Sequence, residues 1–353
     1  MSVKMIEDDA TWDGLVDESP WGSIFHRQAM LRIVERHSGY RLLPFGVYRS
    51  EELISIFPVF YRKGVALASV FAPPPQSCVP YLGPVMSAAS LRAKPSTRES
   101  YLQMAVAEVD AEIRKLAPNY VHIQLPPGHF DIRPFKWHDY DEETNFTYFL
   151  DIDRPLEQIL GSFDRNARRF IREAGARALE VRRTYDVATF CRIMRARYAE
   201  MGLTFPILSE QYLREILEAF PDNVRMYFLY RGDEVVSLVV ITAYHRRMTY
   251  WMGNAKTGSD LAGNEYLIWE LIKRARDEGC TEFEIQGAGD QRLWRFKSKF
   301  NPRLEVCYAI SRKDRIGRVA ERGYWALRSL PGILSRIRPG SRLPSPGQET
   351  PAR

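Results

Sequence analysis

The sequence predicts an α/β protein of two tandem domains, each a mixed β-sheet flanked by helices. The chain has 353 residues and 45% hydrophobic content, which suits two domains of ordinary size with a core each. The second observation is an internal repeat, in which the same elements recur in the same order. We therefore expect domains at 1–152 and 153–312, followed at 313–353 by a basic amphipathic segment and a disordered tail.

The repeat is clearest in a predicted β-hairpin that occurs once in each half. The segment VYRSEELISIFPVF at 47–60 aligns without gaps with LYRGDEVVSLVVIT at 229–242. Both copies join two apolar strands through a tight polar turn, Arg-Ser-Glu-Glu or Arg-Gly-Asp-Glu. A segment whose apolar residues recur at helical spacing precedes each hairpin, QAMLRIVERH in one half and EQYLREILEAF in the other. Duplication therefore explains the pattern better than chance similarity.

Each half then continues with an amphipathic helix and a short strand. These are YLQMAVAEVDAEIRKL with YVHIQL, and NEYLIWELIKRARDEG with EFEIQG. In the second half a further strand, MTYWMG at 248–253, and a polar loop at 254–263 precede the helix. Sheets of this kind place ligands where loops leave the strand ends, so we expect a site near this loop and near the turn at Gly287.

A basic helix is predicted between the two halves, in DIDRPLEQILGSFDRNARRFIREAGARALEVRR. We expect Asp153 as its N-cap, with Pro155 in the first turn. Four arginines then follow at helical spacing, so that their guanidinium groups share one face: Arg165, Arg168, Arg169 and Arg172. Such a cluster suits bidentate contact with phosphate or carboxylate, although a plain solvated face remains an alternative.

Composition argues against several classes of protein. The four cysteines and six histidines show no metal-ligand spacing, so we expect no metal and a reducing compartment. The first residues lack the apolar core of a signal peptide and the longest apolar run is too short for a bilayer, which predicts a cytoplasmic protein. The formal net charge of +6 comes from the segment after residue 311, so the body is nearly neutral and offers little surface for nucleic acid.

The segment GAGDQRLWRFKSKFN at 287–301 interleaves two lysines, Lys297 and Lys299, with Trp294, Phe296 and Phe300. In one interpretation the lysines bury their stems and extend into solvent. In the other, the aromatic neighbours hold Lys297 in a site.

Three segments resemble the FemAB/FemX group of the GNAT-related acyltransferases, which includes BioF2-like and CelD-like relatives. FDRNARRFIREAGARALEVRR is similar to the arginine-rich helix of the family, and EYLIWELIKRARDEGC with TEFEIQGAG to its last helix and strand. LWRFKSKFN is similar to the closing motif, with Lys297 at the lysine position. Asn301-Pro302 departs from the usual glycine, and the long helical arm of some tRNA-using members is missing.

The resemblance implies two tandem GNAT-like domains and the transfer of an acyl or aminoacyl group to an amine, on a precursor of the cell envelope or of a polysaccharide. The donor is then a substrate, acyl-CoA or aminoacyl-tRNA, with no bound cofactor. The loop NAKTGSDLAGNEYL lacks the R/Q-x-x-G-x-G/A spacing that cradles a CoA pyrophosphate, yet Lys256 and the following helix start can still bind phosphate. The acceptor is a small molecule or a lipid-linked precursor.

This chemistry defines the residues that we expect at the site. A neutral amine that attacks an ester or thioester builds an oxyanion, which needs a positive charge, and it must lose a proton. Lys297 is predicted to bind the anionic part of a substrate or to stabilise the developing charge, and Asp290, Glu265 and Tyr250 are alternative proton acceptors. The predicted substrate-binding residues are Arg168, Arg169, Arg172, Lys256, Asn264, Gln286 and Arg295.

The basic C-terminal segment allows two interpretations. Ile316, Val319, Ala320, Tyr324 and Leu327 recur at helical spacing with arginines between them, which is typical of a helix on an anionic membrane surface, here the inner face. In the other interpretation, this helix packs against the body of the protein. A catalytically silent scaffold at the membrane is therefore an alternative function. A nucleic-acid-binding protein is disfavoured because no nucleic-acid module is recognisable, although tRNA stays open as a partner and DNA does not.

Overall fold

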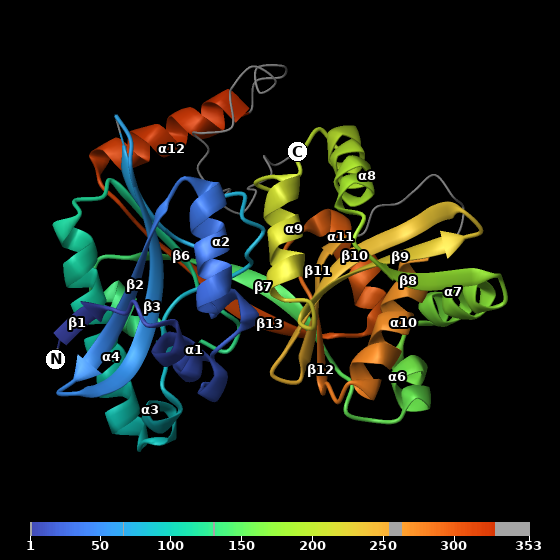
Figure 1. The fold of residues 1–353 in the computed structure, drawn as a ribbon, viewed down its shortest axis with the longest axis horizontal. Coiled ribbons are helices and arrows are strands. Elements are labelled where there is room, and N and C mark those ends of the chain that lie inside the picture. Colours follow the sequence, from blue (N-terminus) through green and yellow to red (C-terminus); the bar gives the residue numbers. More distant parts are fainter. Residues whose placement is uncertain (1, 66, 130, 254–262, 329–353) are drawn as a thin grey trace. The chain divides into compact units, whose positions relative to one another are not determined.

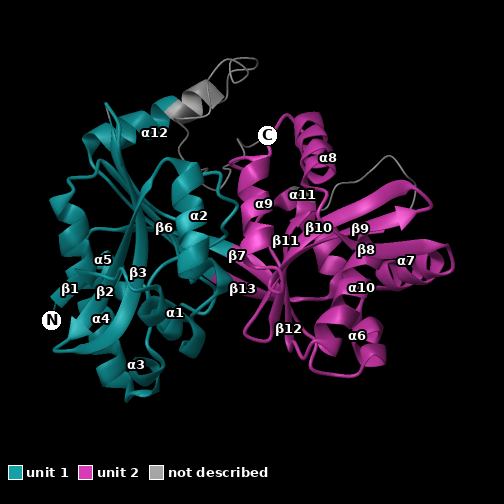
Figure 2. Ribbon diagram, in the orientation of Figure 1, with its two compact units in different colours: residues 1–145, 307–353 teal, residues 146–306 magenta. Residues whose placement is uncertain are grey.

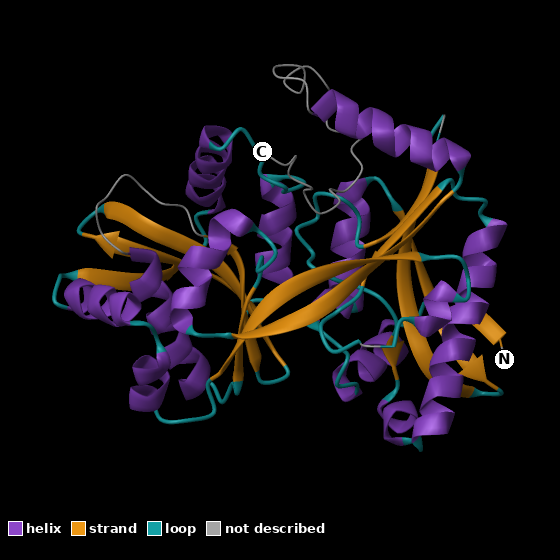
Figure 3. Ribbon diagram, turned by 180° about the vertical axis from the view of Figure 1, so that it is seen from behind, coloured by secondary structure: helices purple, strands orange, loops and turns teal. Residues whose placement is uncertain are grey.

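The computed structural model describes residues 2–65, 67–129, 131–253 and 263–328. The chain forms two compact units, one from 1–145 and 307–353 and one from 146–306 (Figure 2). Both divisions fall inside a strand, the first in β7 (Asp141–Asp151) and the second in β13 (Arg303–Lys313). Each unit is a sheet flanked by helices (Figure 3).

Unit 1 contains a mixed sheet with the strand order β1-β2-β3-β4-β6-β13. Its other strands are β1 (Ser2–Met5), β2 (Arg41–Arg49), β3 (Glu52–Lys63), β4 (Ala68–Ala72), the short β5 (Val85–Met86), which pairs with β3, and β6 (Tyr120–Gln124). Its helices are α1 (Asp9–Glu18), α2 (Gln28–Ser38), α3 (Ala88–Arg92), α4 (Pro95–Lys115), α5 (Arg133–Lys136) and α12 (Arg315–Arg328), with one 3₁₀ turn at Ile24–His26. Among the described strands of this unit, β4 and β6 are the one pair that runs parallel.

Unit 2 contains a second mixed sheet, with the strand order β7-β12-β11-β10-β9-β8. Its other strands are β8 (Leu179–Thr184), β9 (Val224–Arg231), β10 (Glu234–Tyr244), β11 (Arg247–Gly253) and β12 (Glu282–Ile285). Its helices are α6 (Leu156–Ser162), α7 (Arg165–Gly175), α8 (Val187–Glu200), α9 (Glu210–Ala219), α10 (Gly263–Asp277) and α11 (Gln291–Lys297), followed by the 3₁₀ turn η2 (Ser298–Phe300).

The two sheets repeat one topology, as the internal repeat predicts (Figure 1). In each hairpin the strands are antiparallel, with Arg49 opposite Glu52 in unit 1 and Arg231 opposite Glu234 in unit 2. A third strand pairs antiparallel with the second, and a helix then leads to a strand that pairs in parallel. The hairpins, helices and strands predicted from the repeat are therefore confirmed, while the loop expected at 254–263 lies outside the described residues except for Gly263.

The last strand of each sheet comes from the other half of the sequence. β13 follows the second half of the chain, and its residues Ala309 to Lys313 pair antiparallel with β6 in unit 1. β7 follows the first half, and its residues Tyr148 to Asp151 pair antiparallel with β12 in unit 2. The sheet of unit 1 is therefore discontinuous in the sequence, because β13 follows unit 2 in the chain, whereas unit 2 comes from the continuous range 146–306.

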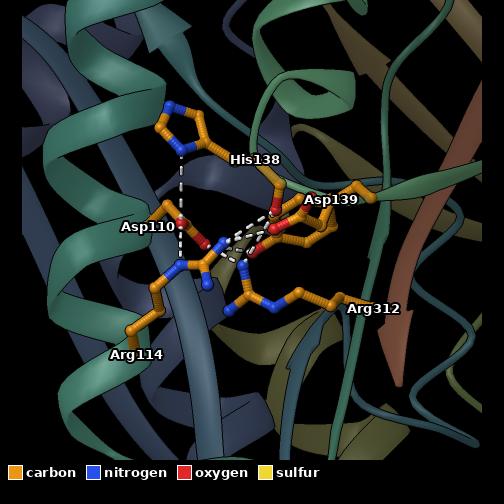
Figure 4. A network of polar contacts seen from close by, with 6 residues as sticks. Asp110, Arg114, His138, Asp139 and Arg312 are labelled. Atoms are coloured by element: carbon orange, nitrogen blue, oxygen red, sulfur yellow. Dashed lines mark hydrogen bonds and ion pairs between the residues drawn. The ribbon is translucent and has the colours of Figure 1, made fainter. Parts of the chain in front are cut away.

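A buried carboxylate ties the exchanged strand β13 into unit 1. Asp110 on α4 is 3% exposed, and Arg312 of β13 forms an ion pair with it (Figure 4). Arg114 Nε lies 2.6 Å from the other carboxylate oxygen, and the Tyr140 hydroxyl donates a hydrogen bond of 2.9 Å. Because an unpaired buried carboxylate is very costly, these partners must be present together.

The basic segment between the halves forms two helices, so the prediction of one helix capped by Asp153 is wrong. The backbone N–H of Asp153 donates to the Asp151 carboxylate, and α6 begins only after Pro155. Phe163 is extended and ends α6, and Asp164 caps α7 by accepting from the Ala167 N–H at 2.6 Å. The break turns the buried ring of Phe163 onto Phe300, with 5.2 Å between ring centroids.

The basic C-terminal segment does begin with a helix, α12, while the tail expected beyond it lies outside the described residues. Among the helices of the described ranges, none is long and apolar enough to cross a bilayer.

Candidate functional site

The candidate site lies in unit 2, where β11 and β12 stop pairing. Their parallel pairing ends at Tyr250 opposite Ile285, although β11 continues to Gly253. On its other edge β11 carries a bulge, since Val240 of β10 faces Met252 while Ile241 faces Tyr250, which leaves Trp251 as the extra residue. Bulges bend a strand and release backbone groups from the ladder. This strand end is therefore suited to receive a ligand.

Lys297 lies at this strand end and is buried. Its side chain is 6% exposed, and Nζ donates to the backbone carbonyl of Gln286, directly after β12. Burial lowers the pKa of Lys297 to about 8, and the negative charge of Asp290 opposes that shift. The interpretation in which this lysine extends into solvent is therefore wrong.

Gly287 provides the space for the Lys297 ammonium group. Its φ angle of +81° lies in the left-handed region that favours glycine. A Cβ atom added there would lie 2.8 Å from Lys297 Nζ. The glycine turn that follows β12 is thus shaped around the lysine.

Lys299 has a different role from Lys297. Its Nζ lies 3.1 Å from Glu265 Oε1, a carboxylate in the first turn of α10 that is 6% exposed. The same ammonium group lies over the rings of Phe170 and Phe296, at 5.3 and 5.7 Å from their centroids. The Glu265 carboxylate is thus held in an ion pair that joins η2 to α10.

The arginine-rich helix α7 begins beside this lysine segment. The Asp164 N–H donates to the Lys299 carbonyl oxygen at 2.8 Å, which fixes the start of α7 against η2. Arg169 and Arg172 are exposed, as is Arg165, and Arg168 is half-buried. Within the described ranges Arg169 pairs with Glu173 at 3.7 Å, and the other three arginines form no ion pair with a carboxylate. This face is therefore available to an anion.

The remaining predicted residues that the structure describes lie on several elements of unit 2. Tyr250 is buried near the end of β11, and its hydroxyl lies 3.1 Å from the position of a Cβ added to Gly253. Asn264 lies in the first turn of α10, where its Oδ1 accepts from the Ser237 hydroxyl. Arg295 is exposed and lies over the ring of Trp294. Lys256 lies outside the described residues.

One buried acid near the site was not predicted from the sequence. Glu284 on β12 is fully buried and accepts hydrogen bonds from Thr147 at 2.9 Å and Thr249 at 3.2 Å. Strand alternation places it on the face opposite Phe283 and Ile285, which pack in the core. The signal in the sequence is a glutamate between apolar residues of a short strand, a pattern that an exposed edge would also produce.

Comparisons with known proteins identify the fold of the unit that contains this site. Residues 161–298 match the Acetyltransferase (GNAT) domain family, a stretch that contains α7, α10 and Lys297. Among solved structures, FemX is 13% identical with a TM-score of 0.66, and the match covers 87% of this chain and 97% of FemX. A search of curated proteins finds no significant match.

Two further structures share the arrangement. The C-terminal domain of a putative lysylphosphatidylglycerol synthetase from Agrobacterium fabrum is 11% identical, with a TM-score of 0.55 over 90% of this chain and 95% of that domain. A tandem GNAT protein from the clavulanic acid biosynthesis pathway is 10% identical, with a TM-score of 0.50 over 88% of this chain and 98% of that protein. At these identities the likeness concerns the fold, and it confirms the predicted pair of tandem GNAT-like units.

Proposed function

We propose that this chain transfers an acyl or aminoacyl group to an amine, because residues 161–298 match the Acetyltransferase (GNAT) domain family and the fold is similar to that of FemX. The observation that carries the proposal is the buried Lys297 ammonium group at the strand end where β11 and β12 separate. A buried cation there is placed to stabilise negative charge that develops on a reacting carbonyl.

In the proposed reaction, the acceptor amine attacks the donor carbonyl, a C–N bond forms, and the C–S or C–O bond to the donor breaks. The Lys297 ammonium group stabilises the oxyanion of the intermediate. Of the three predicted proton acceptors, Asp290 fits best, because its charge already acts on Lys297 while Glu265 is held by Lys299. The leaving thiolate or alkoxide takes up a proton as the intermediate collapses.

We propose that the arginine face of α7 binds phosphate groups of the donor. Acyl-CoA and aminoacyl-tRNA both join a reactive carbonyl to phosphates, so this shared chemistry fits either donor. The face begins beside η2, because the Asp164 N–H donates to the Lys299 carbonyl oxygen. Its phosphate contacts would therefore lie close to the segment that holds Lys297.

We propose an amine of a cell-envelope or polysaccharide precursor as the acceptor, acted on in the cytoplasm. One similar structure is named a putative lysylphosphatidylglycerol synthetase, and the product in that name is an amino acid joined to a lipid. This similarity supports a lipid-linked or small envelope precursor as the class to test first.

The test is ligand-dependent thermal stability combined with a transfer assay on the full chain. A ligand at about a hundred times its Kd adds roughly 2.7 kcal/mol, which raises Tm by several degrees for units of this size. We expect such a shift with CoA and short acyl-CoAs, or else transfer from aminoacyl-tRNA to a panel of precursor amines.

The matched variants are Lys297→Met and Lys273→Met. Lys273 forms a surface pair with Glu270 at 2.6 Å on α10 and controls for the loss of a lysine. We expect Lys297→Met to abolish transfer while the protein stays folded, and Lys273→Met to leave transfer unchanged. Equal transfer by the wild type and Lys297→Met would overturn the proposed role of Lys297. A folded protein that uses neither donor would favour the scaffold function.

A further inference from the structure

The helix α12 is fixed to unit 1 through one face. A Cβ atom added to Gly317 would lie 2.1 Å from the Asn119 carbonyl oxygen, so the helix packs directly on the chain that precedes β6. The Asp314 carboxylate accepts from the Gly317 N–H at 2.7 Å and from the Asn119 amide at 2.8 Å. Figure 2 shows α12 at the rim of unit 1.

Both acidic side chains of this segment contact unit 1, although Asp314 itself is exposed. Asp314 is used as the cap of α12, and Glu321 forms an ion pair with Lys313 of β13 at 2.8 Å. Gly317 and Glu321 are four residues apart and so lie on the same face, the one that packs on unit 1.

The outward face of α12 therefore carries arginines and apolar side chains without acids. Ile316 and Val319 are 55% and 69% exposed, three residues apart on one side of the helix. Arg315, Arg318 and Arg322 are exposed and share the neighbouring side. Across the described residues, no carboxylate forms an ion pair with these three arginines.

From this arrangement we infer that the outward face of α12 docks on an anionic phospholipid bilayer. The arginines match the negative headgroups, and the two exposed apolar side chains enter the boundary between headgroups and acyl chains. A nucleic acid would satisfy the arginines but would leave Ile316 and Val319 exposed to water, so the bilayer fits the face better. This docking goes beyond the proposed transfer reaction and is measured without it.

The experiment is sedimentation of the full chain with vesicles of phosphatidylcholine, alone or with about one third phosphatidylglycerol. We expect binding to the anionic vesicles only. The variant R315Q/R318Q/R322Q should bind roughly a hundredfold more weakly, at about fivefold per arginine. The variant I316S/V319S should bind about tenfold more weakly. The binding that it retains should be lost at about 0.5 M salt, because only the charges are screened.

The matched control is R92Q/K94Q/R98Q, which removes three exposed basic residues from another surface of unit 1. It should bind like the wild type. Thermal unfolding of each variant shows whether it is folded, and the two α12 variants test the same face through different chemistry. The proposal is overturned if both α12 variants bind like the wild type, which would place the contact in the chain after residue 328. It is equally overturned if the wild type binds duplex DNA and ignores anionic vesicles.

Discussion

At the scale of single residues, two lysines of one short motif lie in different environments. Lys297 is buried against the carbonyl of Gln286 beside Gly287, and Lys299 pairs with the carboxylate of Glu265. A single residue separates them in the sequence, yet only Lys297 lies at the strand end where chemistry is proposed. The shape of the Gly287 turn is what separates them.

Gly287→Ala tests whether this turn positions the ammonium group. The new Cβ would meet Lys297 Nζ at 2.8 Å, and an alanine at φ +81° is strained by about 1–2 kcal/mol. We expect transfer activity to fall by about a hundredfold, because a small displacement of a reacting group has that effect. Gly289→Ala is the control, since a Cβ added there meets no atom within 4 Å. Equal activity of the two variants would contradict the positioning role.

Lys297→Met tests the buried charge through stability. Burial lowers the pKa of Lys297 from 10.5 to about 8, so between these values the unfolded chain binds more protons than the folded one. The folded state is therefore penalised below pH 8. The penalty reaches about 3 kcal/mol, because a tenfold change in an acidity constant corresponds to about 1.4 kcal/mol. The penalty is relieved as the pH rises to 10.5.

We expect Lys297→Met to be more stable than the wild type in urea unfolding at pH 7, by an amount that shrinks toward pH 10.5. Other groups titrate equally in both proteins and cancel in the difference. A difference in unfolding free energy that does not change with pH would contradict the lowered pKa. In the transfer assay, kcat/KM of the wild type should fall as the pH rises above about 8, because the cation is lost.

At the scale of elements, the start of α7 joins the arginine face to the lysine segment. The Asp164 side chain caps the helix, and its backbone N–H donates to the carbonyl oxygen of Lys299. The arginines therefore project from a helix whose first turn is fixed against η2. The proposed phosphate binding and the proposed chemistry therefore share one corner of unit 2.

Arg168→Gln with Arg172→Gln tests the anion role of α7. We expect KM for the donor to rise at least tenfold with little change in kcat, since hydrogen bonds to charged groups contribute about 1.5–3 kcal/mol each. The difference from the wild type should shrink at high salt. Arg192→Gln with Arg214→Gln removes two exposed charges from α8 and α9 and should leave KM unchanged. If both pairs raise KM equally, general charge rather than the α7 face is responsible.

At the scale of the whole molecule, each sheet is completed by a strand from the other half of the chain. β13 pairs with β6, and Arg312 on β13 forms an ion pair with the buried Asp110. Residues 1–152 alone would lack this strand, leaving one edge of β6 unpaired and a buried carboxylate without one of its partners.

Expression of 1–152 alone tests the strand exchange. We expect this fragment to aggregate or remain unfolded, and we expect a soluble complex when it is produced together with 153–353. Size-exclusion chromatography and circular dichroism measure both outcomes. A fragment of 1–152 that is monomeric and cooperatively folded by itself would show that β13 is dispensable to unit 1.

Most elements and their order could be predicted from the sequence. The hairpin turns, the helical periods and the repeat depend on neighbours in the chain, so the strands around Arg49 and Arg231 and the spacing of the α7 arginines could be predicted from local pattern. Lys297 was singled out by the resemblance of LWRFKSKFN to the closing motif of the FemAB/FemX group, and its role remains a prediction.

Only the tertiary structure decided which strands complete each sheet, where the basic segment breaks at Phe163, and which lysine is buried. It also revealed Glu284 inside the sheet. These outcomes depend on pairing between residues such as Gln124 and Ala309, which are far apart in the sequence, and on the burial that follows from it. Because hydrophobic burial and strand pairing act through space, a local pattern that suits both a solvated and a buried lysine cannot choose between them.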